Sequence, residues 1–244
     1  MDFIQPDDPV AVSFVHAIKT GDAGAIRRLL EEFPGLASKR ALDKKGGSRT
    51  ALHVVADWPG YFPNAPEIVK MLIAAGADPN ATAVEGQPSE TPLHWAASSD
   101  DVEVAAALID GGADMEAVGG SIAGGTPLDN AVGYGCWNVA RLLVERGARV
   151  DKLWHAAALG MISRMEELMA SIPSPTTNDI NEAFWQACHG GQRRAAEYLL
   201  AQGADINRVP GYSVETPLDI AGSLDTRRDT LTTWLKSIGA KSSK

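Results

Sequence analysis

The chain has 244 residues, of which 45% are hydrophobic, and its formal net charge at pH 7 is −9. The charge is uneven, because residues 1–122 contain nine Lys or Arg against 18 Asp or Glu, whereas residues 123–244 contain 13 of each. An acidic first half argues against charge-driven binding to nucleic acid or to an anionic membrane, and it favours a protein partner with a basic surface.

Two cysteines are too few for a disulfide framework. We expect Cys136 at a turn and Cys188 on the apolar side of a helix in a non-adjacent segment, so that no bridge forms and the compartment is reducing. No stretch reaches the roughly 18 apolar residues of a membrane span, and the acidic start of the chain is unlike a signal peptide. The sequence therefore predicts a cytoplasmic protein.

The first residues in chain order, 1–9, are predicted to form a loose lead-in. A helix pair is then expected near Val10–Lys19 and Ala23–Phe33, with a break at Gly21. The large apolar residues of the second helix recur at helical spacing and predict a buried face. They are Ile26, Leu29 and Leu30.

The clearest motif runs from Thr91 to Ala97 and closes with Gly112. Thr91 can cap a helix whose first turn accepts Pro92, and Gly112 suits the left-handed backbone that ends a helix. Full or degenerate copies recur with a period of roughly 33 residues, the length of a helix pair with a turn. The first large apolar residues of the seven copies are Phe14, Leu52, Leu93, Leu128, Leu153, Phe184 and Leu218.

Repetition of Thr-Pro-Leu-His, a later Leu-Leu or Leu-Ile and Gly-Ala-Asp resembles the ankyrin repeat over about residues 10–240. The resemblance implies an all-α solenoid of stacked antiparallel helix pairs with projecting hairpin or loop fingers. It also implies a single domain over residues 10–240, capped by its first and last repeats and followed by a solvated tail at 241–244. Family members mainly hold other proteins on the concave face formed by the fingers and first helices, and they do so without catalysis.

Three places depart from the repeat pattern, and one of them is the first repeat, which lacks Thr-Pro. The connection Arg149–Lys152 is too short for a full finger, and Ser171–Pro175 stands where Gly-Ala would close the fifth repeat. We expect an irregular stack at residues 148–180. Trp154 and Trp185 flank the missing finger, where they either fill the space that it leaves or form the walls of a ligand pocket.

An insertion between the helices of the second repeat, Asp57–Ala65, carries Trp58, Tyr61 and Phe62. Three aromatic residues on a loop rich in Pro and Gly have two interpretations. The loop is a recognition element, since aromatic residues dominate binding hot spots. Alternatively, its rings fold back over the adjoining repeat and cover apolar surface.

The concave face supplies the other candidate partner-binding residues. Trp95 follows the Leu-His pair, a position that in this family turns toward the concave side, and it either anchors a partner or packs against a finger. The full set of candidates is Trp95, Tyr134, His155, Gln186 and His189, together with Trp58, Tyr61 and Phe62 of the inserted loop. His53 and His94 occupy positions where the family uses histidine to bond the backbone of neighbouring fingers.

No motif in the sequence indicates catalysis or a cofactor. The glycine-rich stretch Val118–Gly125 lacks the phosphate-loop pattern and is predicted to be a long flexible finger. The five histidines show no i, i+4 pairing and no Cys-x-x-Cys accompanies them, so no metal site is expected. We predict a monomeric, non-catalytic scaffold that binds another protein. The alternative is a small-molecule sensor or enzyme with a pocket near residues 150–190.

Overall fold

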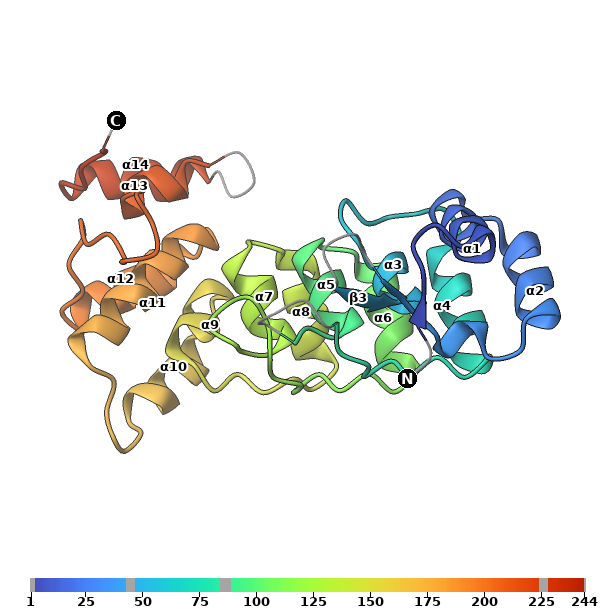
Figure 1. Cartoon of the computed structure of the whole chain (residues 1–244). Coiled ribbons are helices and arrows are strands. Elements are labelled where there is room, and N and C mark those ends of the chain that lie inside the picture. The colour runs from blue at the N-terminus through green and yellow to red at the C-terminus, as the bar shows by residue number, and fades with distance from the viewer. Residues whose placement is uncertain (1–2, 43–46, 84–88, 224–227, 244) are drawn as a thin grey trace. The chain divides into compact units, whose positions relative to one another are not determined.

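The computed structural model describes residues 3–42, 47–83, 89–223 and 228–243. They form two compact units, unit 1 (residues 1–148) and unit 2 (residues 149–244), and each is described by itself. In both, the described residues form helix pairs, as expected for an all-α repeat fold (Figure 1). The single continuous domain predicted over residues 10–240 stays a prediction.

Unit 1 contains four helix pairs in its described residues. The pairs are α1 (Pro9–Thr20) with α2 (Ala23–Glu32), α3 (Ala51–Val55) with α4 (Ala65–Ala74), α5 (Pro92–Ser98) with α6 (Val102–Asp110), and α7 (Pro127–Gly133) with α8 (Trp137–Glu145). The first helices of successive pairs pack together, α5 on both α3 and α7, and the second helices likewise, α6 on both α4 and α8. This arrangement of two rows is the stack that the repeats predicted.

A small sheet lies at the start of unit 1. Strand β1 (Phe3–Ile4) pairs in parallel with β2 (Arg40–Leu42), and β2 pairs antiparallel with β3 (Ser48–Thr50). A short 3-10 helix, η1 (Leu36–Ser38), precedes β2. Residues 3 and 4 therefore belong to the sheet, which differs from the loose lead-in expected, because the backbone of β2 offers them hydrogen-bond partners.

In several repeats the first helix begins at a threonine. The backbone N–H of this threonine donates a hydrogen bond to the side chain three residues later. Thr91 N–H donates to His94 Nδ1 at 3.1 Å, and the equivalent bond between Thr50 and His53 is 3.3 Å. This is the capping arrangement that satisfies the free N–H groups of a helix start. The first helices of these repeats can thus start sharply at Thr-Pro-Leu-His or a variant of it.

The second ring nitrogen of each of these histidines reaches the following repeat. His53 Nε2 lies 3.0 Å from the carbonyl of Glu90, and His94 Nε2 lies 3.1 Å from the carbonyl of Gly125. Burial lowers the pKa of His53 to about 4 and lowers the pKa of His94 below its ordinary value. The structural role predicted for both residues is confirmed.

Unit 2 contains three helix pairs in its described residues. They are α9 (Leu153–Ala158) with α10 (Ile162–Met169), α11 (Thr177–His189) with α12 (Arg193–Ala201), and α13 (Pro217–Ala221) with α14 (Asp229–Ser237). Helix α11 packs on both α9 and α13. It is 13 residues long, because Thr176 caps it and the residues of the irregular fifth repeat lead directly into it.

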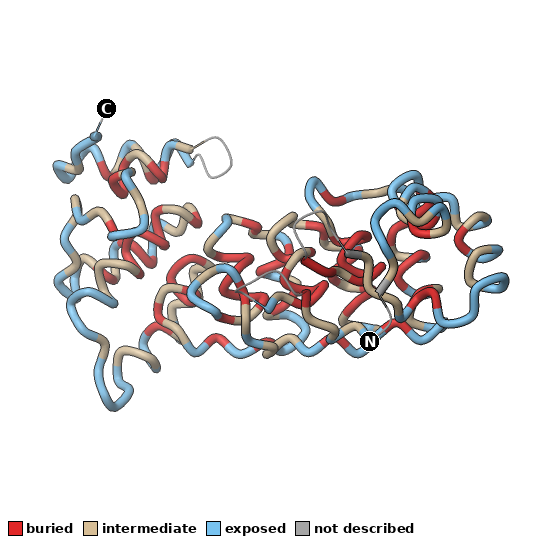
Figure 2. The backbone as a smooth tube through the Cα atoms, in the orientation of Figure 1, coloured by how far each residue is buried: buried red, intermediate tan, exposed pale blue. Residues whose placement is uncertain are grey.

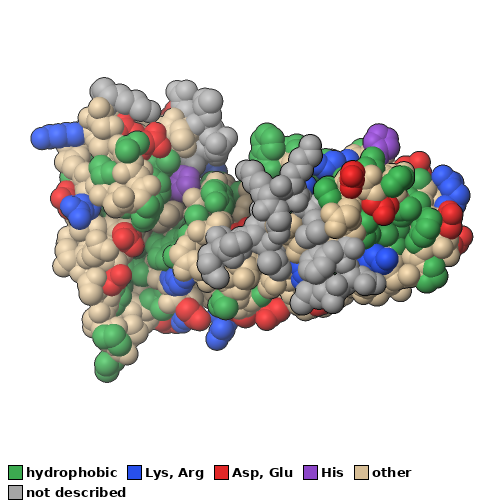
Figure 3. Space-filling model, in the orientation of Figure 1, with side chains coloured by type: hydrophobic (Ala, Val, Ile, Leu, Met, Phe, Trp, Pro, Cys, Tyr) green, Lys and Arg blue, Asp and Glu red, His purple; other side chains and the backbone are tan. Residues whose placement is uncertain are grey.

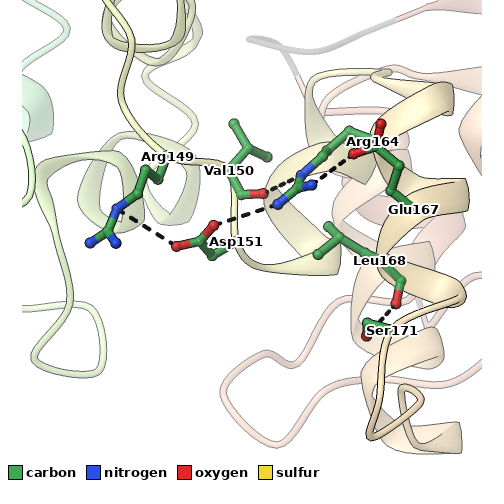
Figure 4. A network of polar contacts seen from close by, with 7 residues as sticks. All are labelled: Arg149, Val150, Asp151, Arg164, Glu167, Leu168 and Ser171. Carbon is green, nitrogen blue, oxygen red and sulfur yellow. Dashed lines mark hydrogen bonds and ion pairs between the residues drawn. The ribbon is translucent and has the colours of Figure 1, made fainter.

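The short connection before α9 is held by Arg164 of α10 (Figure 4). Its Nε donates to the carbonyl of Val150 at 2.8 Å, and its other nitrogens lie 3.5 Å from Asp151 and 2.7 Å from Glu167. One guanidinium therefore fixes the backbone where the sequence lacks a full finger.

The core of each unit follows the facing sides of its helices (Figure 2). Alanine contributes many of these positions, including fully buried Ala96, Ala105 and Ala140. Small side chains allow helix pairs to approach closely, as the sequence indicated. Among the described residues, no helix is long and apolar enough to cross a membrane.

The last described residues are exposed but attached to α13. Ser243 N–H donates to the Asp219 carboxylate at 2.9 Å, and the Ser242 hydroxyl donates to its other oxygen. Lys241 N–H donates to Asn207 at 2.7 Å. The segment predicted as a solvated tail is therefore hydrogen-bonded to Asp219. This residue occupies the position in its repeat that His94 occupies in the third repeat.

Candidate functional site

Trp95 is a half-buried residue on a helix that is mostly buried. Around it on α5, Leu93, His94, Ala96 and Ala97 are buried. Its indole meets the His53 ring edge-on, with ring centres 5.0 Å apart. This contact is intramolecular, but it is made with a residue of helix α3 and not with a finger, and the exposed part of the ring leaves the partner-anchor interpretation open.

Tyr134 lies at the end of α7, as the residue that caps it. Its side chain is 53% exposed, and its hydroxyl lies 3.2 Å from the Ser121 hydroxyl. Asn130, one turn earlier, is fully buried and donates to Glu90 at 2.7 Å and to Ser98 at 3.1 Å. Tyr134 therefore sits at the exposed edge of a buried polar network that joins two repeats.

The glycine-rich segment before α7 is folded onto that helix. Gly120 N–H donates to Gly125 O at 2.8 Å, and Ser121 N–H donates to the Glu90 carboxylate at 2.8 Å. A Cβ added to Gly133 would lie 2.8 Å from Ile122, so the Ile122 side chain packs directly on α7 at a position that has no side chain of its own. The long flexible finger expected here is instead an ordered turn with several bonds to the rest of unit 1.

The candidates of unit 2 lie deeper than predicted. His155 is 2% exposed and Gln186 is 4% exposed, and His189 is half-buried with its Nδ1 3.3 Å from Gln186 Oε1. The surface position expected of His155 and Gln186 is wrong: α9, which carries His155, packs closely against α11, which carries Gln186, and both side chains are buried. As placed, they offer no contact area to a partner.

Trp154 and Trp185, which directly precede His155 and Gln186 in the sequence, differ in how deeply they are buried. Trp185 is buried, donates from Nε1 to the Glu215 carbonyl at 2.9 Å and meets the Tyr212 ring edge-on, which supports the packing interpretation. Trp154 is half-buried, and the Lys152 ammonium lies 5.6 Å from its ring centre.

The two cysteines are buried. Burial raises the pKa of the Cys136 thiol to about 11 and raises that of Cys188 further, so both stay protonated at neutral pH. In the part of the chain that the structure describes, no group of three or more His, Cys, Asp or Glu could hold a metal ion.

The inserted loop bridges two turns. Tyr61 donates its hydroxyl to the carbonyl of Asp100 and its backbone N–H to the Asp101 carboxylate, in the turn of the third repeat. Asn64 donates its amide to Gly21 O at 2.9 Å, in the turn of the first repeat. A Cβ on Gly21 would lie 2.3 Å from Pro63 O, so this approach requires glycine.

The structure leaves both interpretations of the loop open. Tyr61 folds back on its neighbour, yet it stays 59% exposed, and Trp58 is 77% exposed. Phe62 is half-buried and lies 5.9 Å from the Lys19 ammonium. Figure 3 shows that hydrophobic side chains reach the surface at the N-terminal end of unit 1, with acidic and basic side chains around them. Sequence reasoning missed the acidic turn at Asp100, whose contact with Tyr61 spans 39 residues without a local signal.

Comparison with known proteins identifies the repeats. Residues 64–152 match the ankyrin-repeat family, in three copies. The chain is an ankyrin-repeat protein. Ankyrin repeats are generally protein–protein interaction modules.

The relatives that the chain matches are much longer proteins. The chain is 31% identical over 186 residues to the B-cell lymphoma 3 protein homolog of Mus musculus, covering 75% of the chain and 37% of the relative. It is 38% identical over 151 residues to the E3 ubiquitin-protein ligase KEG of Arabidopsis thaliana, covering 58% and 9%. It is 26% identical over 147 residues to an ankyrin repeat and KH domain-containing protein of Caenorhabditis briggsae, covering 58% and 6%. The ankyrin-repeat chain thus spans a minor part of each of these relatives.

Proposed function

We propose that the chain binds a partner protein on its concave face, and that Trp95 and Tyr134 of unit 1 contact this partner. The observation that carries the proposal is the indole of Trp95, which is only half-buried on a helix whose neighbouring side chains are buried. A large apolar ring at the surface of a packed helix row costs hydration free energy unless another surface covers it. Tyr134, 53% exposed, offers a second ring with a polar tip.

The charge of the chain supports a partner with a basic surface. The excess of acidic residues lies entirely in residues 1–122, which contain 18 Asp or Glu and nine Lys or Arg. Complementary charge raises association rates and disfavours other partners. A cytoplasmic location and a monomeric state remain predictions from the sequence.

The test begins with affinity capture from a cell lysate, comparing the wild type with the double variant Trp95→Ala/Tyr134→Ala. The Ile172→Ala variant, at a residue 98% exposed in unit 2, serves as a matched control. Circular dichroism checks that all three proteins are folded. We expect a protein retained by the wild type and the control and lost by the double variant. With that protein purified, the dissociation constant should rise about tenfold or more in the double variant. Retention of the same proteins by all three would overturn the proposal.

A further inference from the structure

A hollow of about 460 Å³ lies beside the inserted loop. It is lined by residues 61–67, at the end of the loop and the start of α4, and by Asp101 and Glu103 at the start of α6. Two aromatic rings and three carboxylates thus line one depression on unit 1. Aromatic walls with a few charged groups are typical of sites that receive a single side chain or small group.

The aromatic wall is already ordered. The backbone N–H of Tyr61 is bonded to the Asp101 carboxylate and its hydroxyl to the Asp100 carbonyl, while the ring stays largely exposed. A ring held at both ends loses little conformational entropy when a ligand contacts its face. A ligand would therefore meet a Tyr61 side chain that is already held in place.

The Asp101 carboxylate is buried and accepts hydrogen bonds from the backbone N–H groups of Tyr61 and Val104, so the carboxylates open to a ligand are Glu67 and Glu103. Glu103 is exposed and forms no ion pair with any residue that the structure describes. Glu67 lies 4.0 Å from Arg27, with both side chains more than half exposed, and such a pair stabilises by little. Burial and the charges of Asp100, Asp101 and Glu103 raise the pKa of Tyr61, in that order of effect. The hollow consequently favours a cation.

We infer that this hollow receives an arginine side chain of the partner protein. A planar guanidinium can stack on an aromatic ring and donate to carboxylates at its edge at the same time, which the compact ammonium of lysine does less well. Phe62 on the same loop already faces one cation, Lys19, at 5.9 Å. The inference rests on the proposed function, and it adds a second contact region away from Trp95.

The test titrates labelled whole chain with acetyl-Gly-Arg-Gly-amide and follows backbone NMR signals. The same peptide with citrulline, which keeps the shape of arginine without its charge, is the matched ligand control. We expect saturating shifts at Tyr61, Glu67 and Glu103, and binding weaker by about tenfold for citrulline. Glu103→Gln should weaken arginine binding severalfold, whereas Glu145→Gln, at an exposed glutamate of α8, should leave it unchanged.

Two results would overturn the inference. One is equal binding of the arginine and citrulline peptides, and the other is shifts that spread over the acidic surface and persist in Glu103→Gln. The Trp95→Ala/Tyr134→Ala variant should titrate as the wild type does, because neither residue lines the hollow. A failed titration together with loss of the partner in that variant would therefore refute the arginine site alone.

Discussion

The carboxylate of Asp100 accepts a hydrogen bond from the backbone N–H of Val139 at 2.9 Å. Its other oxygen accepts from the Asn138 amide at 2.7 Å, and its own carbonyl accepts from the Tyr61 hydroxyl. This one turn residue therefore joins the second, third and fourth repeats. Its backbone is left-handed, with φ 53°, which asparagine, aspartate and glycine tolerate better than other residues.

Substitutions of Asp100 should separate its two contributions to stability. Asp100→Ala removes the carboxylate bonds and strains the left-handed backbone, so we expect a loss of about 2–4 kcal/mol in the free energy of unfolding. Asp100→Gly removes the same bonds without the strain and should cost about 1 kcal/mol less. Urea unfolding followed by circular dichroism measures both. A glycine variant less stable than the alanine variant would contradict this account.

The contact between Ile122 and Gly133 should appear as a coupling between two substitutions. Alanine in place of a helix glycine is normally stabilising by about 1 kcal/mol. In Gly133→Ala that gain should be absent, because the new Cβ would lie 2.8 Å from Ile122. In the Ile122→Ala background the clash is gone and the gain should return. A double-mutant cycle by urea unfolding checks it, and additive effects would show that the segment does not pack on α7.

The roles of His53 and His94 could be predicted through the resemblance to the ankyrin repeat, and the structure adds a local contact that the prediction did not include. The ring bonds the backbone of a threonine three residues earlier, and the repeat length then places the next finger at its second nitrogen. The helix starts at Thr50 and Thr91 follow from the same chemistry. Short-range capping is encoded in a few neighbouring residues, which a repeated motif displays.

The burial of His155 and Gln186 could not be predicted in this way. It depends on how closely α11 packs on α9, which is decided by side chains about thirty residues apart and by the missing finger between them. The strand at Phe3–Ile4 is similar, since two residues have no pattern of their own and pair with Arg40 and Ala41 far along the chain. Contacts made over long sequence distances leave no local signal.

Arg164 should stabilise unit 2 mainly through one backbone bond. Its Nε donates to the Val150 carbonyl, and removing it in Arg164→Met should lower the free energy of unfolding by about 1 kcal/mol. Arg164→Lys should cost nearly as much, because lysine has no equivalent of Nε. Asp151→Asn and Glu167→Gln should each cost less than about 0.5 kcal/mol, since both carboxylates are largely exposed. Urea unfolding distinguishes these cases. A larger effect of the carboxylate variants would show that the ion pairs dominate.

Asp219 should make stability depend on pH below about 4. Burial alone would raise its pKa, but hydrogen bonds from Ser242, Ser243 and Thr216 outweigh this and hold the pKa below its usual range. A carboxyl with a lower pKa in the folded state stabilises above its unfolded pKa of about 4, and the contribution is lost as the pH falls toward the folded pKa. At pH 6 we expect Asp219→Asn to be less stable by about 1 kcal/mol, and the difference should shrink by pH 3. Urea unfolding of both proteins across this range measures it, and a constant difference would mean that the carboxylate charge contributes nothing.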